Sequence, residues 1–361
     1  MSKYTIKYSR RHSARKHSKA LGDIYKIFTE LITNSDESYN RLTNSGEESP
    51  YVKDIRIYID RKTRLIKVVD RAEGMNLEDI HNNFVTYGSI KSGSKRGHHG
   101  RGLYGQGLTD VLFLDPSDSS LVTIKDNRMY KCRFYYDGDD QNFEHEEIKS
   151  REIDKIRKQY DMPENGTIIK FRLPEKMGLP QFQNLVLGLQ NAYMLRFINS
   201  NPNRQVSLIE TENSRKPISQ IIKYIFPEKA FPENIQKIID QQNIYFEYEN
   251  FKLVEAELTL YKVDFDLRRK MGGNDAVGFL IYDANHDNSV YDLDFFKFEN
   301  NPGANSIFGY IKLTNVREII DAKLAENPPE EILTDTREGF VRSHELYRRF
   351  SNAIRDLLTP V

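Results

Sequence analysis

A glutamate and an asparagine, Glu30 and Asn34, stand four residues apart in a segment whose apolar residues have helical spacing. The apolar positions in this segment are Ile24, Ile27, Phe28, Leu31 and Ile32. Their spacing predicts one face of a helix, with Glu30 and Asn34 one turn apart on another face. A carboxylate on such a helix can deprotonate an attacking water, and a carboxamide oxygen can bind Mg²⁺. Taken alone, however, the two residues fit a half-buried surface helix better.

A second polar stretch, Asp70-Arg71-Ala72-Glu73-Gly74-Met75, follows a strand predicted from Leu65 to Asp70. A carboxylate at the end of a strand can accept a hydrogen bond from the exocyclic amine of adenine. The glycine beyond it lets the backbone approach the base. Gly166-Thr167 begins another predicted strand, which ends at Leu173. Each of these stretches also fits an ordinary turn or strand start.

The segment from Gly88 to Gly107 holds seven glycines in twenty residues, which predicts a loop or a lid. It ends in the run Gly100-Arg101-Gly102-Leu103-Tyr104-Gly105-Gln106-Gly107. Backbone N–H groups in such a loop can bind phosphates, and a helix predicted to start near Leu108 adds the positive end of its dipole. A glycine loop is weak support by itself, so its position among the other stretches is what matters.

The elements that must position these stretches follow from the same periodicities. Strands are predicted at 4–8, 55–59, 65–70, 121–125, 129–135 and 166–173, and further helices at 76–86 and 179–198. The run Asn199-Ser-Asn-Pro-Asn predicts a stop, so we expect a domain boundary near 205, with domains 1–204 and 205–361. The second domain mixes strands (246–264, 277–283, 305–313) with helices (217–224, 232–241, 314–326, 340–357).

The composition is that of a soluble globular chain of 361 residues, long enough for two domains. The net charge of zero gives no global argument for a nucleic-acid or anionic membrane partner, although residues 1–26 form a basic arm. A single cysteine, Cys132, excludes a disulfide framework and a zinc site built from several cysteines. No apolar run approaches the length of a membrane span, so we expect a cytoplasmic protein with no membrane partner.

Taken in their order along the chain, these four stretches resemble those of the GHKL family of Bergerat-fold ATPases. The family includes gyrase B, the ninety-kilodalton heat-shock chaperones, histidine kinases and MutL, with MORC proteins nearby. Glu30 and Asn34 match its catalytic glutamate and Mg²⁺-binding asparagine, and Thr167 matches the threonine that helps hold adenine. The resemblance implies an α+β protein: an α/β two-layer sandwich with helices on one face of a mixed sheet, followed by a transducer-like or middle α/β domain.

The glycine-containing motifs complete the resemblance. Asp70 and Gly74, with Met75 beside them, match the adenine-binding Asp-x-Gly-x-Gly motif, and Gly102, Gly105 and Gly107 match the Gly-x-x-Gly-x-Gly lid box. Two positions depart from the pattern. Glu37, with Asp36 beside it, stands where the family has aspartate, and Ala72 stands where its first glycine is common. Because Glu30 is present, we do not expect an inactive site.

The same resemblance implies that a basic residue of the second domain contacts the nucleotide. The segment Glu331-Ile-Leu-Thr-Asp-Thr-Arg-Glu338 resembles the chaperone segment whose Ser-Arg-Glu carries the arginine that contacts the γ-phosphate, so Arg337 is the candidate. Lys312 is the alternative, by analogy with the transducer lysine of gyrase and MutL. A helix-start arginine paired with a nearby glutamate and an exposed strand lysine are the ordinary identities of these residues, and both stay open.

The resemblance implies ATP hydrolysis with Mg²⁺, closure of a lid at about residues 86–107 and an ATP-dependent homodimer. Three biological roles stay open. One is a MORC- or MutL-like clamp on DNA, in phage defence with other subunits. Another is a folding chaperone, against which the chain shows no charged linker or sizeable C-terminal dimerisation domain. The third is a switch that gates assembly with an effector protein.

Ser343-His344-Glu345-Leu346 resembles a phosphoacceptor-histidine box but lies after the ATPase motifs, which favours a chance match.

Overall fold

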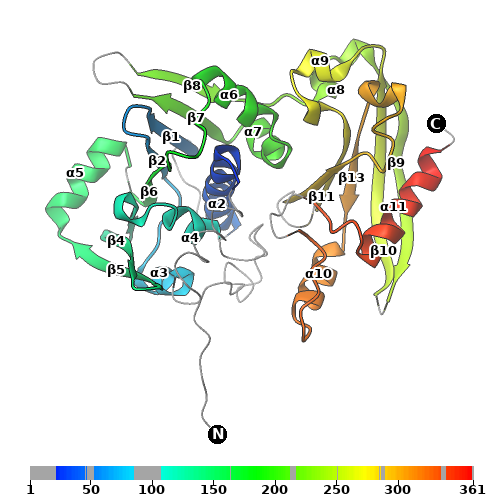
Figure 1. Cartoon of the computed structure of the whole chain (residues 1–361). Helices are drawn as coiled ribbons and strands as arrows, with labels where there is room; N and C mark the ends of the chain where they lie inside the picture. Colours follow the sequence, from blue (N-terminus) through cyan, green and yellow to red (C-terminus); the bar gives the residue numbers. More distant parts are fainter. Residues whose placement is uncertain are drawn as a thin grey trace, which may run out of the picture. The chain divides into compact units, whose positions relative to one another are not determined.

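The computed structural model divides the chain into two compact units (Figure 1). The first takes Met1–Gln190 and Ile198–Lys223, and the second takes Asn191–Phe197 and Tyr224–Val361. The structure describes residues 22–44, 46, 53–84, 107–162, 164–211, 217–249, 251–283, 285, 289–334 and 339–359. Each unit contains one mixed β-sheet flanked by helices, so the expected α+β class is confirmed.

The sheet of the first unit has eight strands in the order β5-β4-β3-β6-β2-β1-β7-β8. The strands are β1 (Asp54–Asp60), β2 (Leu65–Asp70), β3 (Ser120–Lys125), β4 (Arg128–Asp137), β5 (Asp140–Ile148), β6 (Gly166–Arg172), β7 (Gln205–Glu210) and β8 (Ile218–Ile222). Only β1 and β7 pair in parallel; every other neighbouring pair is antiparallel. The strands predicted at 55–59, 65–70, 121–125, 129–135 and 166–173 are all present.

The helices of the first unit include the one predicted to carry Glu30. They are α2 (Ile24–Asn44), α3 (Leu77–Phe84), α4 (Gly107–Leu112), α5 (Ser150–Tyr160), α6 (Phe182–Asn191) and α7 (Arg196–Ser200), the last of which spans the division between the units. The apolar stripe of α2, from Ile24 to Ile32, is fully buried, as its spacing predicts. At the start of α3 the side chains of Asn76 and Asp79 each accept from the backbone N–H of the other, which is a capping box.

Helices lie on both faces of this sheet. Asp70 accepts a hydrogen bond from Ser35 of α2, whereas Val69 packs with Ile153 of α5. Because consecutive side chains of a strand point to opposite faces, α2 and α5 cover different faces. The arrangement differs from the expectation that helices cover one face only. The apolar patch formed by Val69, Ile124 and Ile168 on the second face explains the difference, because α5 covers it.

The division between the units lies further along the chain than the predicted boundary at 204/205. β7 pairs with β1 along its whole length, and β8 pairs with β7, so both strands belong to the first sheet, and the first unit extends to Lys223. Arg204 is also tied to α2, because its Nε lies 2.5 Å from Oδ1 of Asp36 and both side chains are buried. The helix predicted at 217–224 is wrong: its β-branched residues pair as strand β8.

The second unit has a five-stranded sheet in the order β12-β11-β13-β10-β9. The strands are β9 (Ile235–Tyr248), β10 (Phe251–Val263), β11 (Gly278–Asp283), β12 (Ser289–Asp294) and β13 (Ile307–Leu313), and the helices are α8 (Pro227–Ala230), α9 (Leu267–Met271), α10 (Val316–Leu324) and α11 (Glu345–Leu358). Short 3₁₀ turns of the two units lie at Pro116–Asp118, Tyr193–Leu195, Pro232–Asn234, Asn274–Ala276 and Pro302–Ser306. The strands predicted at 277–283 and 305–313 and the helices predicted at 314–326 and 340–357 match β11, β13, α10 and α11.

The helix predicted at 232–241 is wrong, because this segment begins strand β9. Ile235, Ile238 and Ile239 have a spacing that also fits a helix. In the structure, β9 pairs with β10 as a long antiparallel hairpin, and the alternating burial of Ile244, Phe246 and Tyr248 follows the strand period. Long-range pairing therefore overrides the local spacing. Within the ranges that the structure describes, no helix is both long and apolar enough to cross a membrane.

Candidate functional site

Glu30 and Asn34 lie on α2 as predicted, and their side chains contact each other. Nδ2 of Asn34 donates to Oε1 of Glu30 over 3.2 Å, and both residues are half-buried. Gly107, the first residue of α4, packs directly against Glu30. A Cβ atom added at Gly107 would lie 2.0 Å from Glu30 Oε1, so a larger residue here would displace the Glu30 side chain from this position. The last glycine of the predicted lid therefore meets the predicted catalytic glutamate.

Asp70 is buried at the end of β2, where its carboxylate is held on both oxygens. The hydroxyl of Ser35 donates to Oδ2 and the backbone N–H of Ala72 donates to Oδ1, each over 3.1 Å. Thr167 of β6 lies directly opposite Asp70 in the register of the two strands. The pairing of β2 with β6 thus brings together Asp70 and Thr167, which are 97 positions apart in the sequence.

Burial raises the pKa of the Asp70 carboxyl to about 6, although hydrogen bonds from Ala72, Ser35 and Thr167 act in the opposite direction. The desolvation of the charged form is the dominant cause. Above this pKa the Asp70 carboxylate is ionised, and its oxygens can accept a hydrogen bond from an amine that enters the site.

Two glycines allow backbone segments to approach each other beside Asp70. Gly74 has φ of +65°, and a Cβ atom there would lie 2.0 Å from the carbonyl oxygen of Ile124. Gly166 has φ of +156°, and a Cβ atom there would lie 2.3 Å from the carbonyl oxygen of Asp70. The sequence predicts close backbone approach at Gly74, and the structure shows that β3 is one of its neighbours.

Thr123 of β3 is a site residue that the sequence does not identify. Its Oγ1 accepts from the backbone N–H of Met75 over 2.7 Å and lies 3.4 Å from Oγ1 of Thr167. Thr123 therefore fixes the Asp70–Met75 turn against β6. Ser35 was also missed, although it directly follows Asn34. A threonine in a strand carries no signal of its own, because only the cross-strand register places Thr123 opposite Thr167.

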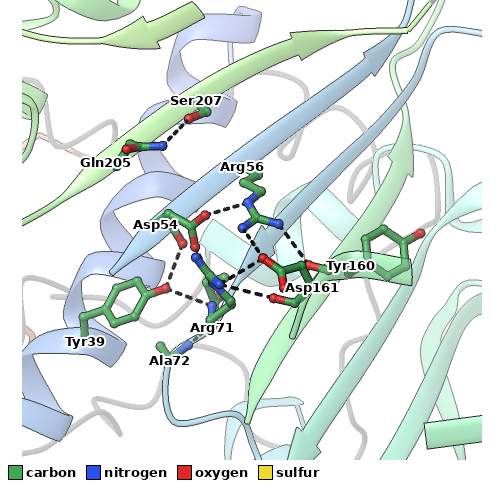
Figure 2. A network of polar contacts seen from close by, with 10 residues as sticks. Tyr39, Asp54, Arg56, Arg71, Ala72, Tyr160, Asp161, Gln205 and Ser207 are labelled. Carbon is green, nitrogen blue, oxygen red and sulfur yellow. Dashed lines mark hydrogen bonds and ion pairs between the residues drawn. The ribbon is translucent and has the colours of Figure 1, made fainter. Parts of the chain in front are cut away.

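An ion-pair network surrounds the residue that follows Asp70 (Figure 2). Arg71 and Arg56 both contact the buried carboxylate of Asp54, through Nε atoms at 2.6 Å and 2.5 Å. Both guanidinium groups also contact Asp161, the residue that ends α5. The hydroxyl of Tyr39 accepts from the backbone N–H of Arg71 and donates to the carbonyl of Asp54. The network joins α2, β1, the end of β2 and the end of α5.

The two departures from the family pattern are both buried. The backbone N–H of Ala72 donates to Asp70, and its methyl group is buried. Glu37 lies three residues beyond Asn34 on α2, and Asp36 beside it is engaged by Arg204. The acid that stands in the family's aspartate position is thus a buried side chain of the site helix.

The second-domain candidates are only partly described. Lys312 lies on β13, half-buried, opposite Glu257 of β10 and Tyr282 of β11 in the strand register. The residues that the structure describes do not include Arg337, Gly100 to Gln106 or the predicted strand at 4–8. His344 caps α11, because its Nδ1 accepts from the backbone N–H of Leu346. This capping role agrees with a chance match to the phosphoacceptor box.

Searches against protein-family models and against curated proteins give no match to this chain. Among the described residues, no group of three or more His, Cys, Asp or Glu side chains is arranged to hold a metal ion.

We predict that the Asp70 carboxyl makes folding stability depend on pH. Its pKa is about 6 in the folded chain, against the usual 3.8, so the folded state holds this proton more tightly than the unfolded state. This contribution to stability is full below about pH 4 and falls as the pH rises through 6, by about 3 kcal/mol. The free energy of unfolding, measured in urea at pH 4 and pH 7, checks this.

The Asp70→Asn variant is the control, because it cannot titrate at this position. We expect its stability relative to the wild-type chain to increase between pH 4 and pH 7. A constant difference between the two proteins over this range would contradict the burial of an ionisable Asp70.

Proposed function

We propose that this chain is a Mg²⁺-dependent ATPase of the GHKL type, with a Bergerat-type first domain and a transducer-like second domain. One observation carries the proposal: α2 contacts the buried Asp70 through Ser35 and also carries the Glu30–Asn34 pair, whose Asn34 directly precedes Ser35. A single rigid helix thus links a carboxylate suited to adenine with a pair suited to a phosphate and its cation. A nucleoside triphosphate is the ligand class that presents both groups.

Asp70, Thr167 and Thr123 form the base end of the proposed site. Asp70 accepts from the exocyclic amine of adenine, while the two threonine hydroxyls, 3.4 Å apart, supply further polar contacts beside it. Gly74 and Gly166 keep this region narrow, because each brings a neighbouring strand within contact distance. Met75, whose N–H is held by Thr123, borders the same turn. These contacts favour a flat heterocycle with an amino group.

Asn34 and Glu30 form the phosphate end. Because the amide nitrogen of Asn34 donates to Glu30, its oxygen is the atom that points elsewhere and suits a hard cation. When bound, Mg²⁺ neutralises charge on the phosphates. Glu30 orients the attacking water and accepts its proton. The contact with Gly107 keeps Glu30 beside the first turn of α4, whose N–H groups follow the glycine run.

The remaining elements of the mechanism follow the resemblance. The segment 86–107 closes over ATP, the closed form pairs with a second copy, and a basic residue of the second domain contacts the γ-phosphate. We place this cycle in the cytoplasm, in a DNA-associated clamp of the MORC or MutL style or a defence system. A chaperone and an effector switch are the alternatives.

The Glu30→Gln variant tests the reaction itself. We expect it to bind ATP with nearly wild-type affinity and to hydrolyse it about 10²–10⁴ times more slowly, because the amide cannot accept a proton. Single-turnover hydrolysis and calorimetric binding measure the two effects separately. Normal turnover in this variant would remove Glu30 as the base.

Substitution of the two second-domain candidates distinguishes them. Arg337→Ala should slow hydrolysis while leaving ATP binding intact, because a guanidinium at the γ-phosphate acts mainly on the transition state. Lys312→Ala serves as the matched comparison. If the rate falls only in the Lys312 variant, the lysine takes the role that the resemblance gives to Arg337.

DNA binding separates the clamp from the other two roles. We expect the full chain to bind duplex DNA more tightly with a non-hydrolysable ATP analogue than without it, and the affinity to fall as salt rises. Fluorescence anisotropy at two salt concentrations measures both effects. DNA affinity that ignores the nucleotide would count against the clamp and favour a protein client.

A further inference from the structure

Asp161 ends α5 on the surface, yet it contacts the arginine that follows the proposed adenine carboxylate (Figure 2). We infer that Asp161 is a positioning residue for the nucleotide site: it holds Arg71, and through Arg71 it holds the turn that orients Asp70. The inference rests on the proposed function, because it concerns the affinity of the same site for the nucleotide. It assigns to α5, which lies on the sheet face opposite α2, a role in nucleotide binding.

Asp161 completes a ring of two arginines and two aspartates. Oδ2 of Asp161 lies 3.2 Å from Nη2 of Arg56 and 3.3 Å from Nη1 of Arg71. The backbone carbonyl of Asp161 accepts from Arg71, and the neighbouring carbonyl of Tyr160 accepts from Arg56 over 3.0 Å. Each guanidinium group therefore bridges the buried Asp54 and the end of α5. The planar donor groups of arginine suit such two-sided contacts.

Two aspartates face two arginines in this ring. Asp54 contributes one negative charge to two arginines, and its side chain is only 4% exposed. Asp161 supplies the second negative charge, although its own side chain is 78% exposed. Without it, each guanidinium group would lose the carboxylate contact that ties it to the end of α5. Of the two arginines, Arg71 directly follows Asp70 in the sequence, so a shift of Arg71 is the one that can reach the site.

Arg71 is connected to Asp70 through the backbone turn between them. The N–H of Ala72 donates to Oδ1 of Asp70, which closes a turn with Arg71 in its middle. The backbone N–H of Arg71 is held by the hydroxyl of Tyr39. Burial raises the pKa of this phenol, so it stays protonated and keeps its bond to the carbonyl of Asp54. A shift of Arg71 would therefore reorient the Asp70 carboxylate.

A second connection runs from Asp161 toward Thr167. Met162, the next residue, is buried, and its sulfur would lie 3.0 Å from a Cβ atom on Gly166. Gly166 in turn packs against the carbonyl of Asp70 and precedes Thr167. The end of α5 is thus placed to affect both polar groups at the base end of the site.

The Asp161→Asn substitution removes the charge and little else. Asp161 has φ of 49°, a left-handed conformation that both aspartate and asparagine tolerate. Its backbone N–H caps α5 by donating to Arg157, and this bond does not depend on the side chain. Asp154→Asn is the matched control, because Asp154 is an exposed aspartate of the same helix that no part of the ring contacts.

The experiment measures ADP affinity by calorimetry and ATP turnover at saturating substrate, with the full chain. We expect Asp161→Asn to bind ADP about two- to fivefold more weakly, which is the range of an exposed ion pair, and its kcat to stay unchanged. Asp154→Asn should match the wild-type chain in both. Arg71→Lys, which cannot bridge both carboxylates, should also weaken binding, and adding Asp161→Asn to it should have no further effect.

The outcomes separate the two levels of the proposal. Wild-type ADP affinity in Asp161→Asn, or an equal loss in Asp154→Asn, would overturn the positioning role while leaving the ATPase intact. A fall in kcat at unchanged affinity would overturn it as well. Absence of ADP binding in the wild-type chain would overturn the proposed function, and this inference with it.

Discussion

The burial of the Asp70 carboxylate is the constraint on which the first unit depends. A carboxylate removed from water is costly unless its oxygens are hydrogen-bonded. Here one oxygen is satisfied by α2, through Ser35, and the other by the turn after β2, through Ala72. The position of α2 relative to the sheet is therefore tied to the position of Asp70. Because Glu30 and Asn34 lie on the same helix, the bond between Ser35 and Asp70 also sets where they stand.

Close backbone packing supplies what hydrogen bonds alone cannot. Gly74 and Gly107 bring the turn after β2 and the start of α4 into contact with Ile124 and Glu30. A methyl group at Gly74 would lie 2.0 Å from the backbone carbonyl oxygen of Ile124 and would push the turn away from β3, whereas a methyl group at Gly107 would displace the Glu30 side chain. Close packing within the fold thus explains why glycine stands at these two motif positions, in addition to any contact with a ligand.

Local signals in the sequence predict the parts of the site that lie within one element. The apolar stripe of α2 and the capping box of α3 depend on residues within one or two turns, and both are present. β8 and the first part of β9 were predicted as helices, because isoleucines spaced three and four apart satisfy either period. Thr123 and Asp161 were missed for a related reason. Their roles arise from strand register and from contacts across 90 positions or more, which no local pattern records.

Two aspartates in one ring of ion pairs have different physical roles because their burial differs. Asp54 is nearly inaccessible to water, so loss of its charge would leave two arginines poorly compensated in a low-dielectric region and would destabilise the fold. Asp161 is mostly exposed, so solvent screens its charge and its contribution is small. A contact that contributes little to stability can be weakened without loss of the fold. Because Asp161 lies at the surface, we expect added salt to weaken its contacts with Arg56 and Arg71 more than the contacts of Asp54.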